Sequence, residues 1–218
     1  MQEGLNFPDA ASGEAGRIEL APGACVLRNF ASSVAPSLLD AIDGVLARSP
    51  LRHMVTPRGS RVSVRMSNCG DLGWISDRRG YRYAAVDPLS GEKWPPMPAG
   101  FADLASRAAG AAGFDGFRAD ACLINAYEPG MKLSLHQDRD EQDFSAPIVS
   151  VSLGLPALFQ FGGERRGDPV QRIPLGHGDV VVWGGPARLR FHGVLTVREG
   201  MHPLTGRLRY NLTLRKAG

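Results

Sequence analysis

Lysine, cysteine and long apolar runs are all scarce in this chain of 218 residues. Lys93, Lys132 and Lys216 are the only lysines, so arginine supplies most of the 25 basic residues, and codon bias in a GC-rich genome is the simplest source of that skew. No apolar run approaches the 18 or so residues of a membrane-spanning helix. Polar residues 1–17 lack the basic start and apolar centre of a secretory signal. We therefore expect a flexible leader over residues 1–20 and no membrane partner.

The three cysteines, Cys25, Cys69 and Cys122, are widely spaced and form no CxxC motif. An odd count without paired spacing argues against a disulfide framework and favours a reducing compartment. The hydrophobic content of 43% and charged content of 22% are those of an ordinary globular domain. A net charge of +3 is compatible with a nucleic-acid partner without requiring one. We expect one domain, acting as a monomer in the cytoplasm.

Helical patterns are confined to the first half of the chain, whereas strand patterns dominate the second. Apolar residues recur at helical spacing over 33–48 and 99–112. Residues 57–96 are rich in arginine and aromatics but poor in aliphatics, so we expect a flap that lies over another part of the molecule. Six short strands separated by turn residues are predicted after Gly113, at 121–127, 148–155, 158–161, 179–183, 192–197 and 209–214. Many short strands with regular turns indicate a sandwich or jelly roll whose one sheet the helices cover.

The last of these strands places two arginines on a single face. Side chains alternate along a strand, so Arg209, Asn211, Thr213 and Arg215 point to the side opposite Tyr210, Leu212 and Leu214. A polar face with two cations needs water or an anion against it, and arginine grips carboxylates in a two-pronged way. The strand therefore predicts an anion site. Arg209 and Arg215 lie roughly 20 Å apart along it, and the pattern does not say which of them pairs with the anion.

A second signal is the pair His136 and Asp138, followed 54 residues later by His192. On a strand, residues two apart point the same way, and two imidazoles with one carboxylate are the ligands of non-haem Fe(II) oxygenases. Zinc accepts the same set. The arginine strand favours iron, because an oxygenase that consumes 2-oxoglutarate needs a dicarboxylate site. His53, His177 and His202 lie in turns and loops, and we expect them to face solvent.

Several strings over this half of the chain, in matching order and spacing, resemble the AlkB family of iron(II)- and 2-oxoglutarate-dependent dealkylases, especially its bacterial DNA-repair members. The resemblance extends from about Gly23 to the end. Its strings are CLINAY at 122–127, LSLHQD at 133–138, PIVSVSLG at 147–154, FQFGG at 159–163, GDVVVWGG at 178–185 and RYNLTLR at 209–215, with LGW at 72–74 and YRY at 81–83 upstream.

The resemblance implies an α+β, mainly β fold. It has a double-stranded β-helix (jelly-roll) core over about 114–218, flanking N-terminal helices and a β-hairpin nucleotide-recognition lid over about 57–96. It implies that Fe(II) is held by three catalytic ligands, and that 2-oxoglutarate and O2 are co-substrates. The implied metal ligands are His136, Asp138 and His192, and the implied 2-oxoglutarate contacts are Asn125, Tyr127, Arg209, Asn211 and Arg215.

By the same resemblance, the substrate is a methylated base, N1-methyladenine or N3-methylcytosine, in single- or double-stranded DNA or in RNA. Because the methyl group lies on the base-pairing edge, the nucleotide must leave the stack. The implied substrate contacts are Trp74, Tyr81, Tyr83, Asp140 and Arg166, with His136 facing Trp74 across the base. Two alternatives remain: an oxygenase acting on RNA or a protein side chain, and a jelly-roll module that binds metal without catalysis.

Overall fold

A computed structural model describes residues 16–218, so most of the predicted leader lies outside the described residues. Residues 16–20 were wrongly placed in that leader, because they belong to the first strand. The elements are β1 (Gly16–Ala21), β2 (Ala24–Arg28), η1 (Ser32–Val34), α1 (Ala35–Leu46), β3 (Arg52–Val55), β4 (Arg61–Gly70), β5 (Gly73–Asp77), β6 (Gly80–Ala84), α2 (Ala99–Ala111), β7 (Ala121–Tyr127), β8 (Leu133–His136), β9 (Ile148–Gly154), β10 (Ala157–Phe161), β11 (Gln171–Leu175), β12 (Val180–Trp183), η2 (Gly185–Ala187), β13 (His192–Val194) and β14 (Arg209–Arg215).

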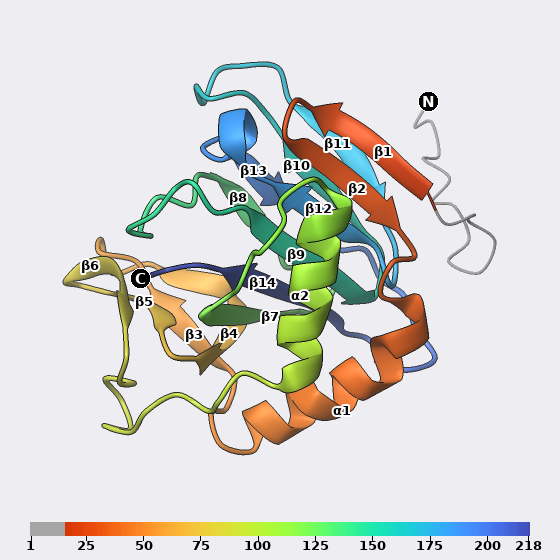
Figure 1. The fold of residues 1–218 in the computed structure, drawn as a ribbon. Helices are drawn as coiled ribbons and strands as arrows, with labels where there is room; N and C mark the ends of the chain where they lie inside the picture. The colour runs from red at the N-terminus through yellow and green to blue at the C-terminus, as the bar shows by residue number, and fades with distance from the viewer. Residues whose placement is uncertain (1–15) are drawn as a thin grey trace.

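Two sheets face each other, and both helices lie against the larger one (Figure 1). The larger sheet has eight strands in the order β1-β2-β12-β9-β14-β7-β4-β3, and the smaller has four in the order β11-β10-β13-β8. This is the jelly-roll arrangement that the turn pattern predicted. Within residues 16–218, no helix combines the length and apolar character needed to cross a bilayer.

Two apolar clusters fill the two spaces between these layers. One joins α1 and α2 to the larger sheet and includes Ile42, Phe101 and Leu212, all fully buried. The other lies between the sheets and includes Phe159 and Trp183. Each fully buried aliphatic or aromatic side chain contributes about 1.5–3 kcal/mol by leaving water. The larger sheet is therefore fixed from both faces, which makes it a rigid base for a site.

The predicted lid and core boundaries need correction. β4 is part of the eight-stranded sheet, where Met66 pairs with Asn125 of β7. Residues 61–70, which the predicted lid included, form β4 as one continuous strand. Within the predicted lid, only β5 and β6 form a separate hairpin, in which Asp77 pairs with Gly80 at the turn. Since β1 to β4 also belong to the larger sheet, the core begins well before residue 114. The sequence did not predict β1 to β3, which are short. Among the described strands β1 pairs only with β2 and β3 only with β4, while β2 joins the rest of the sheet by pairing with the distant β12.

Candidate metal centre and co-substrate pocket

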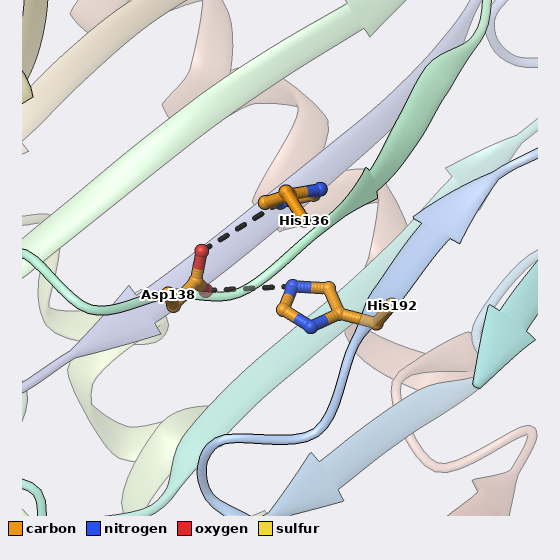
Figure 2. Close-up of side chains that lie close together, drawn as sticks. All are labelled: His136, Asp138 and His192. Carbon is orange, nitrogen blue, oxygen red and sulfur yellow. Dashed lines mark ion pairs between the residues drawn. The ribbon is translucent and has the colours of Figure 1, made fainter. Parts of the chain in front are cut away.

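Neighbouring strands of the smaller sheet bring the two histidines together. His136 ends β8 and is paired in register with His192, which begins β13. Asp138 does not continue the strand, as the sequence had suggested, but lies in the loop just after it. Its carboxylate turns back so that Oδ1 is 3.6 Å from His136 Nε2 and Oδ2 is 3.6 Å from His192 Nε2 (Figure 2). All three donor groups offer atoms within 4.8 Å of one another, close enough to share one ion.

Both imidazoles present a free lone pair to this point. His136 Nδ1 lies 2.9 Å from the Ser134 carbonyl and His192 Nδ1 lies 3.1 Å from the Arg190 carbonyl. A carbonyl accepts a hydrogen bond only from a protonated nitrogen, so Nδ1 donates in each ring and Nε2 is left to bind a metal. Burial and the neighbouring His136 lower the pKa of His192 to about 4, which keeps its ring neutral at physiological pH.

Asp138 keeps its negative charge despite being buried. Burial alone would raise its pKa, but the Arg215 guanidinium and the two imidazoles outweigh burial and hold the pKa below its usual value. Two imidazole nitrogens and one carboxylate on one side of a point leave the opposite positions open. That donor set fits Fe(II) with a chelating co-substrate.

One cavity of about 710 Å³ is lined by the three candidate metal ligands, here called the metal cluster (His136, Asp138 and His192), and by the polar face of β14. Every predicted site residue except Tyr83 lines it: His136, Asp138, His192, Asn125, Tyr127, Arg209, Asn211, Arg215, Trp74, Tyr81, Asp140 and Arg166. β14 pairs with β7 so that Arg209 faces Tyr127 and Asn211 faces Asn125. The polar face predicted from alternation is therefore buried between the two sheets rather than exposed to solvent.

The two arginines of β14 differ sharply in their partners. Arg215 donates to Asp138 Oδ2 from Nη2 at 2.6 Å and from Nε at 3.0 Å. Arg209 is 1% exposed, donates from Nη2 to Ser152 Oγ at 3.0 Å and lies over the Tyr127 ring. Its Nε and Nη1 have no hydrogen-bond partner among residues 16–218. A buried guanidinium with two unused donors fits a carboxylate ligand.

An amide network supports this floor. Asn211 donates from Nδ2 to Ser150 Oγ at 2.8 Å, and Thr213 Oγ1 donates to Asn211 Oδ1 at 3.0 Å. Asn125 Nδ2 donates to the same Asn211 oxygen at 3.2 Å. The side-chain Oδ1 of Asn125 is buried without a partner among the described residues, so it is available to a ligand in the cavity. Ser150 and Ser152 escaped the sequence prediction, because small polar residues in an apolar run carry no distinctive signal.

Aromatic residues of the β5–β6 hairpin stand at the cavity mouth. Trp74 and Tyr81 stack with ring centroids 5.7 Å apart and an interplanar angle of 13°. Trp74 Nε1 donates to Asp140 Oδ2 at 2.8 Å, and the Arg166 guanidinium lies 5.0 Å from the Phe191 ring centroid. Tyr83 does not reach the cavity, because its hydroxyl donates to Glu141 Oε1 at 2.9 Å. It was predicted as a substrate contact, and the structure instead places it in contact with a buried carboxylate.

The remaining histidines lie apart from the cluster. His177 and His202 are not simply solvent-facing, since their rings stack with centroids 4.5 Å apart and both are partly buried. His53 Nδ1 contacts the Val62 carbonyl at 2.8 Å. Glu141 and Arg188 were not predicted as site residues. They form a buried ion pair, and Arg188 donates to the backbone carbonyl of Asp138. A hint lay in the charged run after His136, where Asp138, Asp140 and Glu141 follow closely.

Comparisons with known proteins agree with this geometry. Residues 23–215 match the model of the 2OG-Fe(II) oxygenase superfamily. The alpha-ketoglutarate-dependent dioxygenase AlkB of Salmonella typhimurium is 61% identical over 198 residues, covering 91% of this chain and 92% of that protein. The chain belongs to the AlkB family.

Two further relatives support this assignment. The AlkB dioxygenase of Escherichia coli is 58% identical over 91% of this chain and 92% of its own length. The solved structure of OsALKBH1 superposes with a TM-score of 0.83 at 28% identity, covering 92% of this chain and all of that one. This AlkB-family protein is therefore an enzyme, a dioxygenase that uses Fe(II), 2-oxoglutarate and O2.

Proposed function

We propose that this enzyme removes methyl groups from the base-pairing edge of alkylated nucleobases in DNA, with N1-methyladenine and N3-methylcytosine as substrates. The observation that carries the proposal is the content of one cavity. It contains the His136–Asp138–His192 cluster, a buried arginine with unused donors, and a stacked aromatic pair at the mouth. The relatives of this chain in Salmonella typhimurium and Escherichia coli are AlkB dioxygenases, which supports a role in direct-reversal repair.

His136, Asp138 and His192 would hold iron(II). When bound, the iron supplies the oxidation that turns 2-oxoglutarate and O2 into succinate and CO2 and releases the methyl group as formaldehyde. The protein's own contribution is to orient the reactants and exclude water from them. The buried polar face of β14 serves this purpose, since a keto-diacid held there lies beside the cluster and away from solvent.

Arg209 is our candidate for the distal carboxylate of 2-oxoglutarate. Its free Nε and Nη1 supply two donors, whereas the Arg215 guanidinium is already committed to Asp138. Arg215 instead holds one oxygen of the ligand Asp138 in place. We therefore propose Arg209, and not Arg215, as the partner of the distal carboxylate, a choice that the spacing of the two arginines left open. Asn125 and Tyr127 would complete the co-substrate contacts from β7.

Trp74 offers a flat surface for an extruded base, because aromatic stacking accepts any base. His136 lines the same cavity, with its side chain 36% exposed, and would face the base from the side opposite Trp74. Asp140 keeps Oδ1 for an exocyclic amino group while Oδ2 accepts from Trp74. N1-methyladenine and N3-methylcytosine are cationic, so a carboxylate at the mouth favours them over neutral bases. Arg166 and Tyr81 would contact the flanking backbone.

Turnover on matched substrates tests the proposal. Formaldehyde and succinate are quantified with Fe(II), 2-oxoglutarate and O2 on methylated DNA, methylated RNA and a methylated peptide. Equimolar formaldehyde and succinate on methylated DNA, with unmethylated DNA as control, is the expected result. Formaldehyde release only from RNA or peptide would show that the substrate is not DNA. If no succinate formed with any substrate, the protein would be a metal-binding module without catalysis. Monomeric state and cytoplasmic location stay predictions.

A further inference from the structure

A buried chain of polar side chains runs from the β5–β6 hairpin to the metal cluster. The Tyr83 hydroxyl donates to Glu141 Oε1 at 2.9 Å. The same oxygen lies 3.2 Å from Arg215 Nε. Arg215 in turn donates to Asp138 Oδ2 from both Nε and Nη2. Three contacts therefore separate a lid residue from the carboxylate of a candidate metal ligand.

Arg188 forms a second connection between Glu141 and Asp138. Its Nη1 donates to the Asp138 carbonyl at 2.9 Å and its Nε to the Ala146 carbonyl at 3.1 Å. Its Nη2 lies 3.1 Å from Glu141 Oε2, and both side chains are almost fully buried, at 3% and 1% exposed. Glu141 thus lies between two guanidinium groups. That of Arg188 donates to the Asp138 backbone carbonyl, and that of Arg215 donates to the Asp138 carboxylate.

The charges in this cluster balance, since Arg188 and Arg215 face Asp138 and Glu141. Arg215 and a metal ion draw on the same Asp138 carboxylate. Glu141 attracts part of the positive charge of Arg215 at Nε, so Asp138 gives up less of its electron density to the guanidinium. Without Glu141, Arg215 would pair with Asp138 alone and compete more strongly with the ion. Partners in this outer layer commonly set the affinity of a metal site.

We propose that Glu141 is a positioning residue that links the β5–β6 hairpin to Asp138, through Tyr83 on one side and Arg215 on the other. Binding of a metal fixes Asp138, and the chain of contacts passes this order to the hairpin that covers the mouth. The proposal deepens the proposed function and rests on it, in that lid and metal cluster serve one substrate. It commits to no particular base or strand.

The first experiment measures Mn(II) affinity, a redox-inert probe of the cluster, by calorimetry on the full chain. Glu141→Gln keeps the shape and removes the charge, and we expect its affinity to fall by roughly 10- to 100-fold. Asp143→Asn is the matched control, because Asp143 is an exposed carboxylate two residues away. It should bind Mn(II) as the wild type does. A folded Glu141→Gln protein within about twofold of wild type overturns the positioning role.

The second experiment follows the hairpin itself. Amide hydrogen exchange in β5 and β6 is recorded with and without Mn(II) and 2-oxoglutarate. In the wild type, exchange should slow by about two- to tenfold when they bind, a typical size for coupling between linked sites. Tyr83→Phe removes only the hydroxyl contact and should abolish this slowing. Asp77→Asn, which alters the exposed pair with Arg82 in the same hairpin, should retain it.

The two experiments separate this inference from the proposed function. Neither uses nucleic acid, so a failure to demethylate any oligonucleotide leaves their readouts intact. Slowing that persists undiminished in Tyr83→Phe overturns the link to the hairpin even if DNA is demethylated. If Glu141→Gln fails to fold, the Tyr83→Phe exchange measurement still decides, because that variant keeps every charge of the cluster.

Discussion

The polar face of β14 and the β5–β6 hairpin both contribute to the cavity, but their surroundings fix them to different degrees. β14 is paired in register on both sides, with β7 and with β9, and its four polar residues are at most 6% exposed. β5 and β6 pair only with each other among the described strands, and Tyr81 is 47% exposed.

A few side chains anchor the hairpin in place of a sheet. Asn68 donates to the Trp74 carbonyl and accepts from the Trp74 amide, both at 2.9 Å. Trp94 packs so closely on Gly73 that an added Cβ would come within 2.3 Å of its ring. The floor is thus built in advance for a small anion, whereas the lid is held at discrete points suited to a larger and more variable substrate. The predictions below test that contrast.

Removal of a candidate metal ligand should have the largest effect. His136→Ala is expected to lower formaldehyde release by several orders of magnitude, because the oxidation depends on the metal. The side chain stands at the cavity mouth and is 36% exposed, so the thermal midpoint should change little. Formaldehyde assay and thermal denaturation of the metal-free protein check both halves. Retained turnover would refute the metal assignment.

The next largest effect concerns Arg209. Arg209→Met removes a buried charge whose Nε and Nη1 lack partners among residues 16–218, so the ligand-free protein should be as stable as wild type or more so. The KM for 2-oxoglutarate should rise on the order of 100-fold, since a charge-assisted contact is lost. 2-Oxoglutarate with Mn(II) should raise the melting temperature of the wild type well beyond that of the variant.

Arg215→Met is the matched substitution on the same strand, and it should act in the opposite way on stability. It leaves Asp138 and Glu141 short of a buried cation, a loss that typically costs about 3–5 kcal/mol. Urea denaturation of both metal-free variants compares them directly. If both substitutions change the free energy of unfolding in the same direction by the same amount, the proposed difference between the two arginines is wrong: Arg209 would not be the one with donors free for a ligand.

A smaller effect is expected at the lid. Trp74→Ala should weaken binding of a methylated oligonucleotide by about 1–3 kcal/mol, the usual worth of one aromatic–base stack. Uncoupled turnover of 2-oxoglutarate should be preserved, because the floor does not depend on this ring. Fluorescence anisotropy and succinate assays measure the two quantities, with Leu89→Ala as an exposed control outside the cavity. Equal loss of both activities would mean that Trp74 is structural.

Local patterns predicted the floor well and the lid less well, for physical reasons. Alternation along β14 is a property of any strand, so the shared face of Arg209 and Arg215 followed from the sequence. Their different partners did not, because the Asp138 loop and Glu141 approach only Arg215 in the folded protein. A partner 77 residues away in sequence leaves no local trace.

The position of β4 shows the same limit. Its arginines and small residues suggested a flap, yet it lies beside β7 in the large sheet, where its neighbours supply the apolar contacts. The resemblance implied Tyr83 as a substrate contact together with Tyr81, and alternation puts both side chains on the same face of β6. The Tyr83 hydroxyl instead donates to Glu141, a partner 58 residues away that no local pattern reveals. The resemblance named residues that the fold brings to one cavity, Tyr83 excepted, and their contacts in the folded protein were not readable from the sequence.

The smallest predicted effect lies outside both regions, at the stacked pair of His177 and His202. Burial lowers the pKa of both rings, and His202 further lowers that of His177. His177 Nδ1 accepts from the Gly154 amide at 3.0 Å, so protonation there costs a hydrogen bond. Since the unfolded chain binds these protons more readily, stability should be greatest above about pH 6.5 and fall as the pH drops below it.

His202→Gln isolates this contribution, because the buried His192 affects wild type and variant alike. The free energy of unfolding, from urea denaturation at about pH 7.5 and pH 5.5, should change less with pH in the variant than in the wild type. The two changes should differ by less than about 1 kcal/mol, since both rings are partly exposed and solvent screens them. An unchanged pH dependence would show that the stacked pair binds protons equally in the folded and unfolded states, and would contradict the prediction. Gly154 pairs with Arg209 at one end of β14, so the hydrogen bond that His177 loses on protonation lies next to the floor of the cavity.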